Sequence, residues 1–138
     1  MKKSKISTAL EILEDEKRGD KKSALKKMCV GYSMTWVYKS LKGELFPKTK
    51  PNIKKVMEDV YGIQGRQYDI KNIAEGENVV MIELVESYPD TETKKIYRTP
   101  LVLILEFSGN KIKKGRHYCD PNLSYLHLTE EQIKNIFN

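Results

Sequence analysis

Apolar residues recur at helical spacing in three segments of the first half of the chain. The spacing predicts short amphipathic helices over 7–18, 21–28 and 52–61. Gly19 ends the first segment, and Asp20 is a residue type typical of the N-cap of the second. A strand rich in β-branched and aromatic residues is predicted over 33–38, between the second and third helices.

From residue 65 onward the pattern changes to the two-residue period of β-strands. Turn residues divide this region into four predicted strands, at 67–75, 78–87, 93–107 and 111–119. Because the connections are short, we expect an antiparallel meander. Thr129 followed by Gln132 is a capping-box sequence and predicts a short C-terminal helix.

Helices first and an antiparallel sheet afterwards predict an α+β domain with the helices on one face of the sheet. The 138 residues suit one domain, so we expect it to span 1–138. The segment 101–107 is apolar almost throughout, which is typical of a strand buried on both faces. Since the helices are too few to cover both faces, we expect a homodimer.

The composition bears on the kind of partner. The formal net charge is +6, which first suggests nucleic acid, but 21 of the 25 basic residues are Lys and acidic residues are interspersed among them. Arg is the better phosphate ligand. We therefore favour a solvated Lys-rich surface, with no nucleic-acid partner, over a Lys-mediated binder of nucleic acid or an acidic protein.

Membrane and metal partners are not expected either. No apolar run is long enough to span a membrane, so we expect a cytoplasmic protein with no membrane partner. The two cysteines, Cys29 and Cys119, and the two histidines, His117 and His127, lack the spacing of a disulfide framework or a zinc site. We expect no metal and no cofactor.

A motif near the end of the predicted sheet carries a family resemblance. Gly109 to Ile112 followed by Arg116, Tyr118 and Asp120 is similar to the "G-K-I, then R-x-Y-x-D" ending of the last long strand in SnoaL-like polyketide cyclases, a branch of the nuclear transport factor 2-like superfamily. Here Asn110 is inserted after the Gly. The turn at 74–79 and the order of elements over nearly the whole chain also resemble that family.

The resemblance implies a curved antiparallel sheet wrapped around three N-terminal helices, a fold that is also described as cystatin-like, with a short C-terminal helix. It further implies one conical pocket between the helices and the concave face. Dimers of this family form through the convex face, which agrees with the expectation drawn from 101–107.

The last strand supplies the first candidates for a site. Strict alternation places Ile112, Arg116, Tyr118 and Asp120 on one face, and Ile112 and Tyr118 indicate the pocket side. His117 then falls on the other face, as a surface or dimer-interface histidine. A carboxylate in an apolar pocket has a raised pKa and can act as a general base.

The resemblance assigns the same role to Asp120, because the Asp at this point is the base in the cyclases. Arg116 or Tyr118 would then steady the enolate-like charge. The alternative is structural, since Asp120 precedes Pro121 and an Asp-Pro pair often ends a strand and orders a turn.

Other residues are candidates for the lining of the pocket. Large amphipathic and polarizable side chains suit a flat or aliphatic ligand, although they can equally fill the core. Glu83 shares a strand face with Met81, whereas Glu86 on the other face reads as a strand-end charge. The candidate lining residues are Trp36, Tyr38, Met57, Tyr61, Met81 and Glu83.

Two functions of the pocket stay open. The first is a cyclase- or isomerase-like protein that binds a small hydrophobic or carbonyl-containing ligand and removes a proton next to the carbonyl, without a cofactor. The second is a non-catalytic ligand-binding or dimeric association module of the same fold. The sequence leaves open whether the protein is an enzyme.

Overall fold

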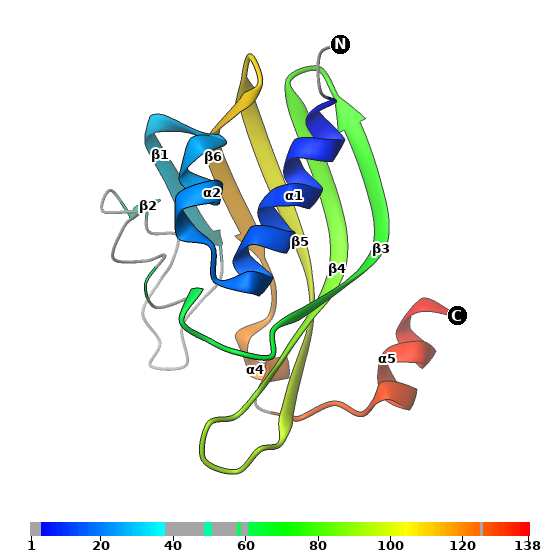
Figure 1. Ribbon diagram of the computed structural model, residues 1–138. Helices are drawn as coiled ribbons and strands as arrows, with labels where there is room; N and C mark the ends of the chain where they lie inside the picture. The colour runs from blue at the N-terminus through cyan, green and yellow to red at the C-terminus, as the bar shows by residue number, and fades with distance from the viewer. Residues whose placement is uncertain (1–3, 38–48, 51–57, 59–60, 125) are drawn as a thin grey trace.

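The computed structural model is a curved sheet with two helices across one face (Figure 1). It describes residues 4–37, 49–50, 58, 61–124 and 126–138. The helices are α1 (Lys5–Arg18), α2 (Lys21–Lys26), α4 (Pro121–Ser124) and α5 (Glu130–Phe137). The strands are β1 (Met28–Val37), β2 (Thr49–Lys50), β3 (Gln67–Gly76), β4 (Val79–Pro89), β5 (Ile96–Ser108) and β6 (Lys111–Tyr118). The predicted α+β class is confirmed.

The order of the strands in the sheet is β2-β1-β6-β5-β4-β3. Strands β3 to β6 form the predicted antiparallel meander, with bounds close to those expected. Strand β1 adds to β6 in parallel, which the sequence did not predict. No helix in the described part of the chain is long and apolar enough to cross a membrane.

The first two helices begin and end where their capping residues predict. Gly19 adopts the left-handed conformation (φ 73°) that ends α1, and the Asp20 side chain accepts a hydrogen bond from the backbone N–H of Ser23. Helix α2 is shorter than predicted, because the Lys27 carbonyl already accepts a hydrogen bond from the Ile112 N–H of β6 at 2.9 Å. Met28 therefore belongs to β1. The third predicted helix, 52–61, lies mostly outside the described residues.

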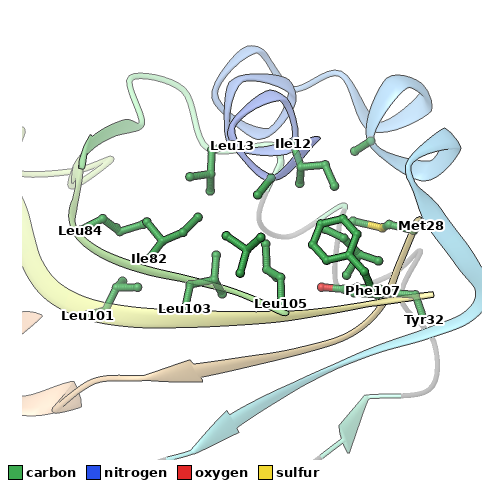
Figure 2. Packing of buried hydrophobic residues seen from close by; sticks show 14 residues of the cluster. Ile12, Leu13, Met28, Tyr32, Ile82, Leu84, Leu101, Leu103, Leu105 and Phe107 are labelled. Carbon is green, nitrogen blue, oxygen red and sulfur yellow. The ribbon is translucent and has the colours of Figure 1, made fainter. Parts of the chain in front are cut away.

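The core lies between α1 and the concave face of the sheet (Figure 2). Ile12 and Leu13 point from α1 toward the apolar side chains of β4 and β5. In β5 burial alternates: Leu101, Leu103, Leu105 and Phe107 are buried, while the residues between them are only partly covered. In the single chain one face of 101–107 is buried and the other is only partly covered. Burial of the second face depends on the expected homodimer, which stays a prediction.

A β-bulge in β6 changes which residues face the core. Phe107 pairs with Ile112, but Glu106 pairs with Lys114, so Lys113 is an extra residue in β6. Because an extra residue shifts the alternation by one, Ile112 and His117 lie on the same, concave side. Arg116 and Tyr118 lie on the opposite side.

Candidate functional site

A cavity of about 280 Å³ lies between α1 and the concave face of the sheet. Its apolar wall comes from Ile12 and Leu13 of α1 and from leucines of β4 and β5, several of which appear in Figure 2. Five large aromatic side chains also line it: Tyr32, Trp36, Tyr61, Tyr68 and Tyr88. The cavity is therefore mostly apolar, with several hydroxyl groups as potential hydrogen-bond partners.

Two carboxylates share one buried guanidinium at this cavity. Arg66, whose side chain is only 4% exposed, lies with Nη1 2.7 Å from Oε1 of Glu86 and with Nε 4.0 Å from Oε1 of Glu16. Its guanidinium carbon stands 4.9 Å from the centre of the Tyr88 ring. The close ion pair is thus made with Glu86, and Glu16 is the more weakly compensated carboxyl.

The environment of Glu16 moves its titration toward neutral pH. Burial raises the pKa of Glu16 to about 7, and the nearby Glu86 adds to this, while the Tyr68 hydrogen bond and the charge of Arg66 oppose it. The Tyr68 hydroxyl donates that hydrogen bond to Oε1 of Glu16. Glu16 therefore exchanges a proton in the pH range in which a general base works best.

The other polar groups of the cavity are uncharged near neutral pH. Burial lowers the pKa of His117, so its imidazole is neutral, and burial raises the pKa of Tyr32 and Tyr61, so both phenols keep their protons. Nδ1 of His117 is buried and has no hydrogen-bond partner among the described residues. Neutral phenols can donate to a developing negative charge.

No group of three or more His, Cys, Asp or Glu side chains that could hold a metal ion occurs within the described ranges. Cys29 and Cys119 are both free thiols. The groups that the described cavity offers for chemistry are thus an acid, an ion pair, an imidazole and several phenols.

Some of the predicted lining residues are found in the cavity. Trp36 and Tyr61 line it, and their part in ligand binding stays a prediction. Tyr38 and Met57 lie outside the described residues. Met81 and Glu83 are not part of the described lining: Met81 is 46% exposed, and Glu83 accepts a hydrogen bond from the side-chain amide of Asn72 at 2.8 Å.

The predicted placement of Arg116, Tyr118 and Asp120 in the pocket is wrong. Arg116 forms an ion pair with Glu106 on the opposite side of the sheet, and Tyr118 is 38% exposed. Asp120 is exposed, and its Oδ1 accepts hydrogen bonds from the backbone N–H and the side-chain amide of Asn122, at 2.9 and 3.1 Å. The bulge at Lys113 inverts the predicted alternation, and Asp120 orders the turn into α4.

Two further assignments, those of His117 and Glu86, are also wrong. His117 lines the cavity instead of facing outward, because the bulge shifts it by one position. Glu86 also lines the cavity and is not a strand-end charge. It continues the inward series of Ile82 and Leu84, two residues apart along β4.

Glu16 and Arg66 were not predicted from the sequence. Glu16 lies one turn after Ile12, on the apolar face of α1. A carboxyl at such a position is unusual in an amphipathic helix, and this pattern could have identified Glu16 from the sequence. Arg66 precedes β3 and gives no comparable signal in the pattern.

No protein-family model and no curated protein matches the sequence. Solved structures match it over most of their length. IdmH from Streptomyces antibioticus, a candidate polyketide cyclase, is 9% identical, with a TM-score of 0.74 and coverage of 91% of this chain and 98% of that chain.

Two further structures agree with this similarity. A candidate SnoaL-like polyketide cyclase from Jannaschia sp. CCS1 is 10% identical, with a TM-score of 0.69 and coverage of 91% and 94%. An NTF2-like protein of unknown function from Cytophaga hutchinsonii is 12% identical, with a TM-score of 0.68 and coverage of 88% and 95%. The chain therefore has the nuclear transport factor 2-like fold that the resemblance implied.

Proposed function

We propose that the cavity binds a small, mostly apolar carbonyl compound, and that Glu16 removes a proton from the carbon next to the carbonyl. The observation that carries this proposal is a carboxyl of pKa about 7 in an apolar, aromatic-lined cavity. A base of this pKa is ionised often enough at neutral pH to accept a proton and is basic enough to hold it. Glu16 takes the role that the sequence analysis gave to Asp120.

The proposed step moves one proton and one electron pair. The C–H proton passes to a carboxylate oxygen of Glu16, the C–H electron pair forms the C=C bond of an enolate, and negative charge develops on the carbonyl oxygen. The uncharged phenols of Tyr32 and Tyr61 are the donors available to that oxygen. Return of the proton to another carbon isomerises the ligand. Alternatively, attack of the carbanion on a second carbonyl closes a ring, and the alkoxide that forms takes the proton back from Glu16.

The names of two structural neighbours support the choice of a carbonyl compound. Both are candidate polyketide cyclases, and polyketides are built around carbonyl groups. The similarity is one of fold, so the proposal depends on the cavity of this chain and not on those names.

The second candidate is a non-catalytic binding module with the same cavity. The hydrogen bond from Tyr68 to Glu16 favours it, because a carboxyl held in place by a phenol can serve structure alone. The two candidates differ in whether a bound ketone exchanges its α-protons.

The experiment measures α-proton exchange of 4-phenyl-2-butanone in D2O by proton NMR. We expect the protein to accelerate the exchange and Glu16→Gln to lower the accelerated rate about 100-fold or more, which is the usual range for loss of a general base. The accelerated rate should rise with pH up to about 7, as Glu16 loses its proton.

Glu14→Gln is the matched control, because Glu14 is an exposed carboxyl on the same helix. Equal exchange with Glu16→Gln and the unaltered protein would refute Glu16 as the base. Binding of the ketone without any exchange would support the non-catalytic module instead.

A further inference from the structure

The positive charge of Arg66 at the cavity is already compensated by carboxyl groups of the chain itself. Arg66 is the only cationic side chain among the described residues of the lining, and it is in contact with Glu86 at 2.7 Å. The second carboxyl, Glu16, lies 4.0 Å from the same guanidinium. With both carboxyls ionised these three groups carry a net charge of −1, and with Glu16 protonated they carry none.

The sheet holds Glu86 in this position. Glu86 stands directly opposite Tyr68 in the β3–β4 ladder and opposite Thr99 in the β4–β5 ladder, so its backbone is fixed from both sides. Arg66 lies two residues before Tyr68, and its guanidinium packs over the ring of Tyr88, the next inward residue of β4. Two carboxyl groups and one aromatic ring therefore lie around this guanidinium.

An arginine at an apolar cavity is the side chain that would ordinarily bind a carboxylate or a phosphate. Here an anionic ligand would have to displace Glu86 or enter a site with no net positive charge. Placing like charges together at low dielectric, without a counter-ion, is costly. An uncharged carbonyl group meets neither obstacle.

We infer that Glu86 determines the class of ligand by occupying Arg66, so that the cavity accepts uncharged carbonyl compounds and excludes carboxylates and phosphates. The inference rests on the proposed function and names the ligand class of the same cavity. Glu86 is thus a specificity-determining residue, distinct from the base Glu16.

The experiment uses two ligands of nearly the same shape. 4-Phenyl-2-butanone and 3-phenylpropanoate differ by a methyl group in place of a carboxylate oxygen. Trp36 is the single tryptophan of the chain and lines the cavity, so its fluorescence reports binding. At mildly alkaline pH we expect the ketone to bind about tenfold more tightly than the acid, or better, since an uncompensated buried charge costs at least that much.

Glu86→Gln keeps the shape of the side chain and removes its charge. In this variant we expect the ratio of acid affinity to ketone affinity to rise about tenfold or more, because Arg66 then pairs with the ligand. Glu83→Gln is the matched control, on the same strand but outside the described lining, and should leave the ratio unchanged.

Two outcomes would overturn the inference. One is an unaltered protein that binds the acid as tightly as the ketone, a comparison that needs no variant to fold. The other is a Glu86→Gln protein with native circular dichroism and an unchanged ratio. A protein that binds the ketone more tightly than the acid but does not accelerate α-proton exchange would count against Glu16 as the base alone. A protein that accelerates the exchange but binds both ligands equally tightly would count against this inference alone.

Discussion

Two glutamates of the cavity differ in role because one guanidinium serves them unequally. Arg66 lies 2.7 Å from Glu86 but 4.0 Å from Glu16, so Glu86 forms the ion pair. Glu16 receives a phenol hydrogen bond instead, and its burial raises its pKa to about 7. When two carboxyl groups of one site lie in different environments, one commonly stays ionised and stabilises charge while the other transfers a proton.

The raised pKa of Glu16 has a consequence for stability. Its folded pKa of about 7 lies above the ordinary value of 4.5, so between these values the folded state holds a proton that the unfolded state has lost. The free energy of unfolding therefore falls as pH rises from 4.5 to about 7, by up to about 3 kcal/mol, and levels off above.

Glu16→Gln removes this contribution. We expect the variant to gain stability relative to the unaltered protein as pH rises across that window, measured by urea unfolding at several pH values. Glu14→Gln should show no such gain. A difference between Glu16→Gln and the unaltered protein that does not change with pH would contradict the assignment.

Single residues of the site were only partly predictable from sequence. Trp36 and Tyr61 were identified as large amphipathic side chains, and both line the cavity. Glu16 was missed because an acid on a helix is usually solvated. Asp120 was misplaced although its residue type suits a base, because the pattern shows residue types and spacing but not the bulge that sets their direction.

At the level of elements, the β1–β6 pair shapes one wall of the cavity. Met34 stands opposite Gly115 in the parallel ladder. A Cβ at Gly115 would meet the Met34 side chain at 2.7 Å and the Tyr32 hydroxyl at 3.0 Å, so these side chains would have to shift to make room for it. Both neighbours line the cavity.

Gly115→Val should therefore displace Met34 and Tyr32. We expect a loss of about 1–3 kcal/mol in the free energy of unfolding, typical of overpacking in a core, together with weaker ketone binding. Urea unfolding and Trp36 fluorescence measure the two effects. Lys114→Val is the control, because Lys114 is exposed on the same strand. A Gly115→Val protein as stable as the control would show that the wall is not packed as described.

Helices and strands were predicted well where local signals fix them. Gly19, Asp20 and the capping box of Thr129 and Gln132 set helix ends through their own backbone and side-chain hydrogen bonds. The parallel pairing of β1 with β6 joins segments about 80 residues apart, and the bulge at Lys113 lies in the β5–β6 ladder. Neither has a signal in the local pattern.

For the molecule as a whole, the convex face is the second feature of interest. Met81 and Ile104 pair across β4 and β5 there, and Met81 and Tyr118 are exposed hydrophobic residues. The C-terminal helix α5 packs on part of the same sheet through Ile133 and Val85. The uncovered part is the surface on which we predict the second subunit.

Met81→Glu tests this prediction. We expect the unaltered protein to be a dimer by size-exclusion chromatography with light scattering, and the variant to shift to a monomer, because a charge is placed in an apolar contact. Ketone binding should persist, since Met81 lies outside the described lining. Glu77→Gln, in the exposed β3–β4 turn, is the control. A monomeric unaltered protein would refute the predicted dimer.

The proposed function of the cavity depends most directly on the protonation of the Glu16 carboxyl. Carbon-13 NMR of glutamate-labelled protein, with the Glu16 signal identified by its absence in Glu16→Gln, gives its pKa in a pH titration. We predict a midpoint of about 7. A midpoint near the ordinary 4.5 would mean that Glu16 is solvated and fully ionised at neutral pH, and the proposed base would be contradicted.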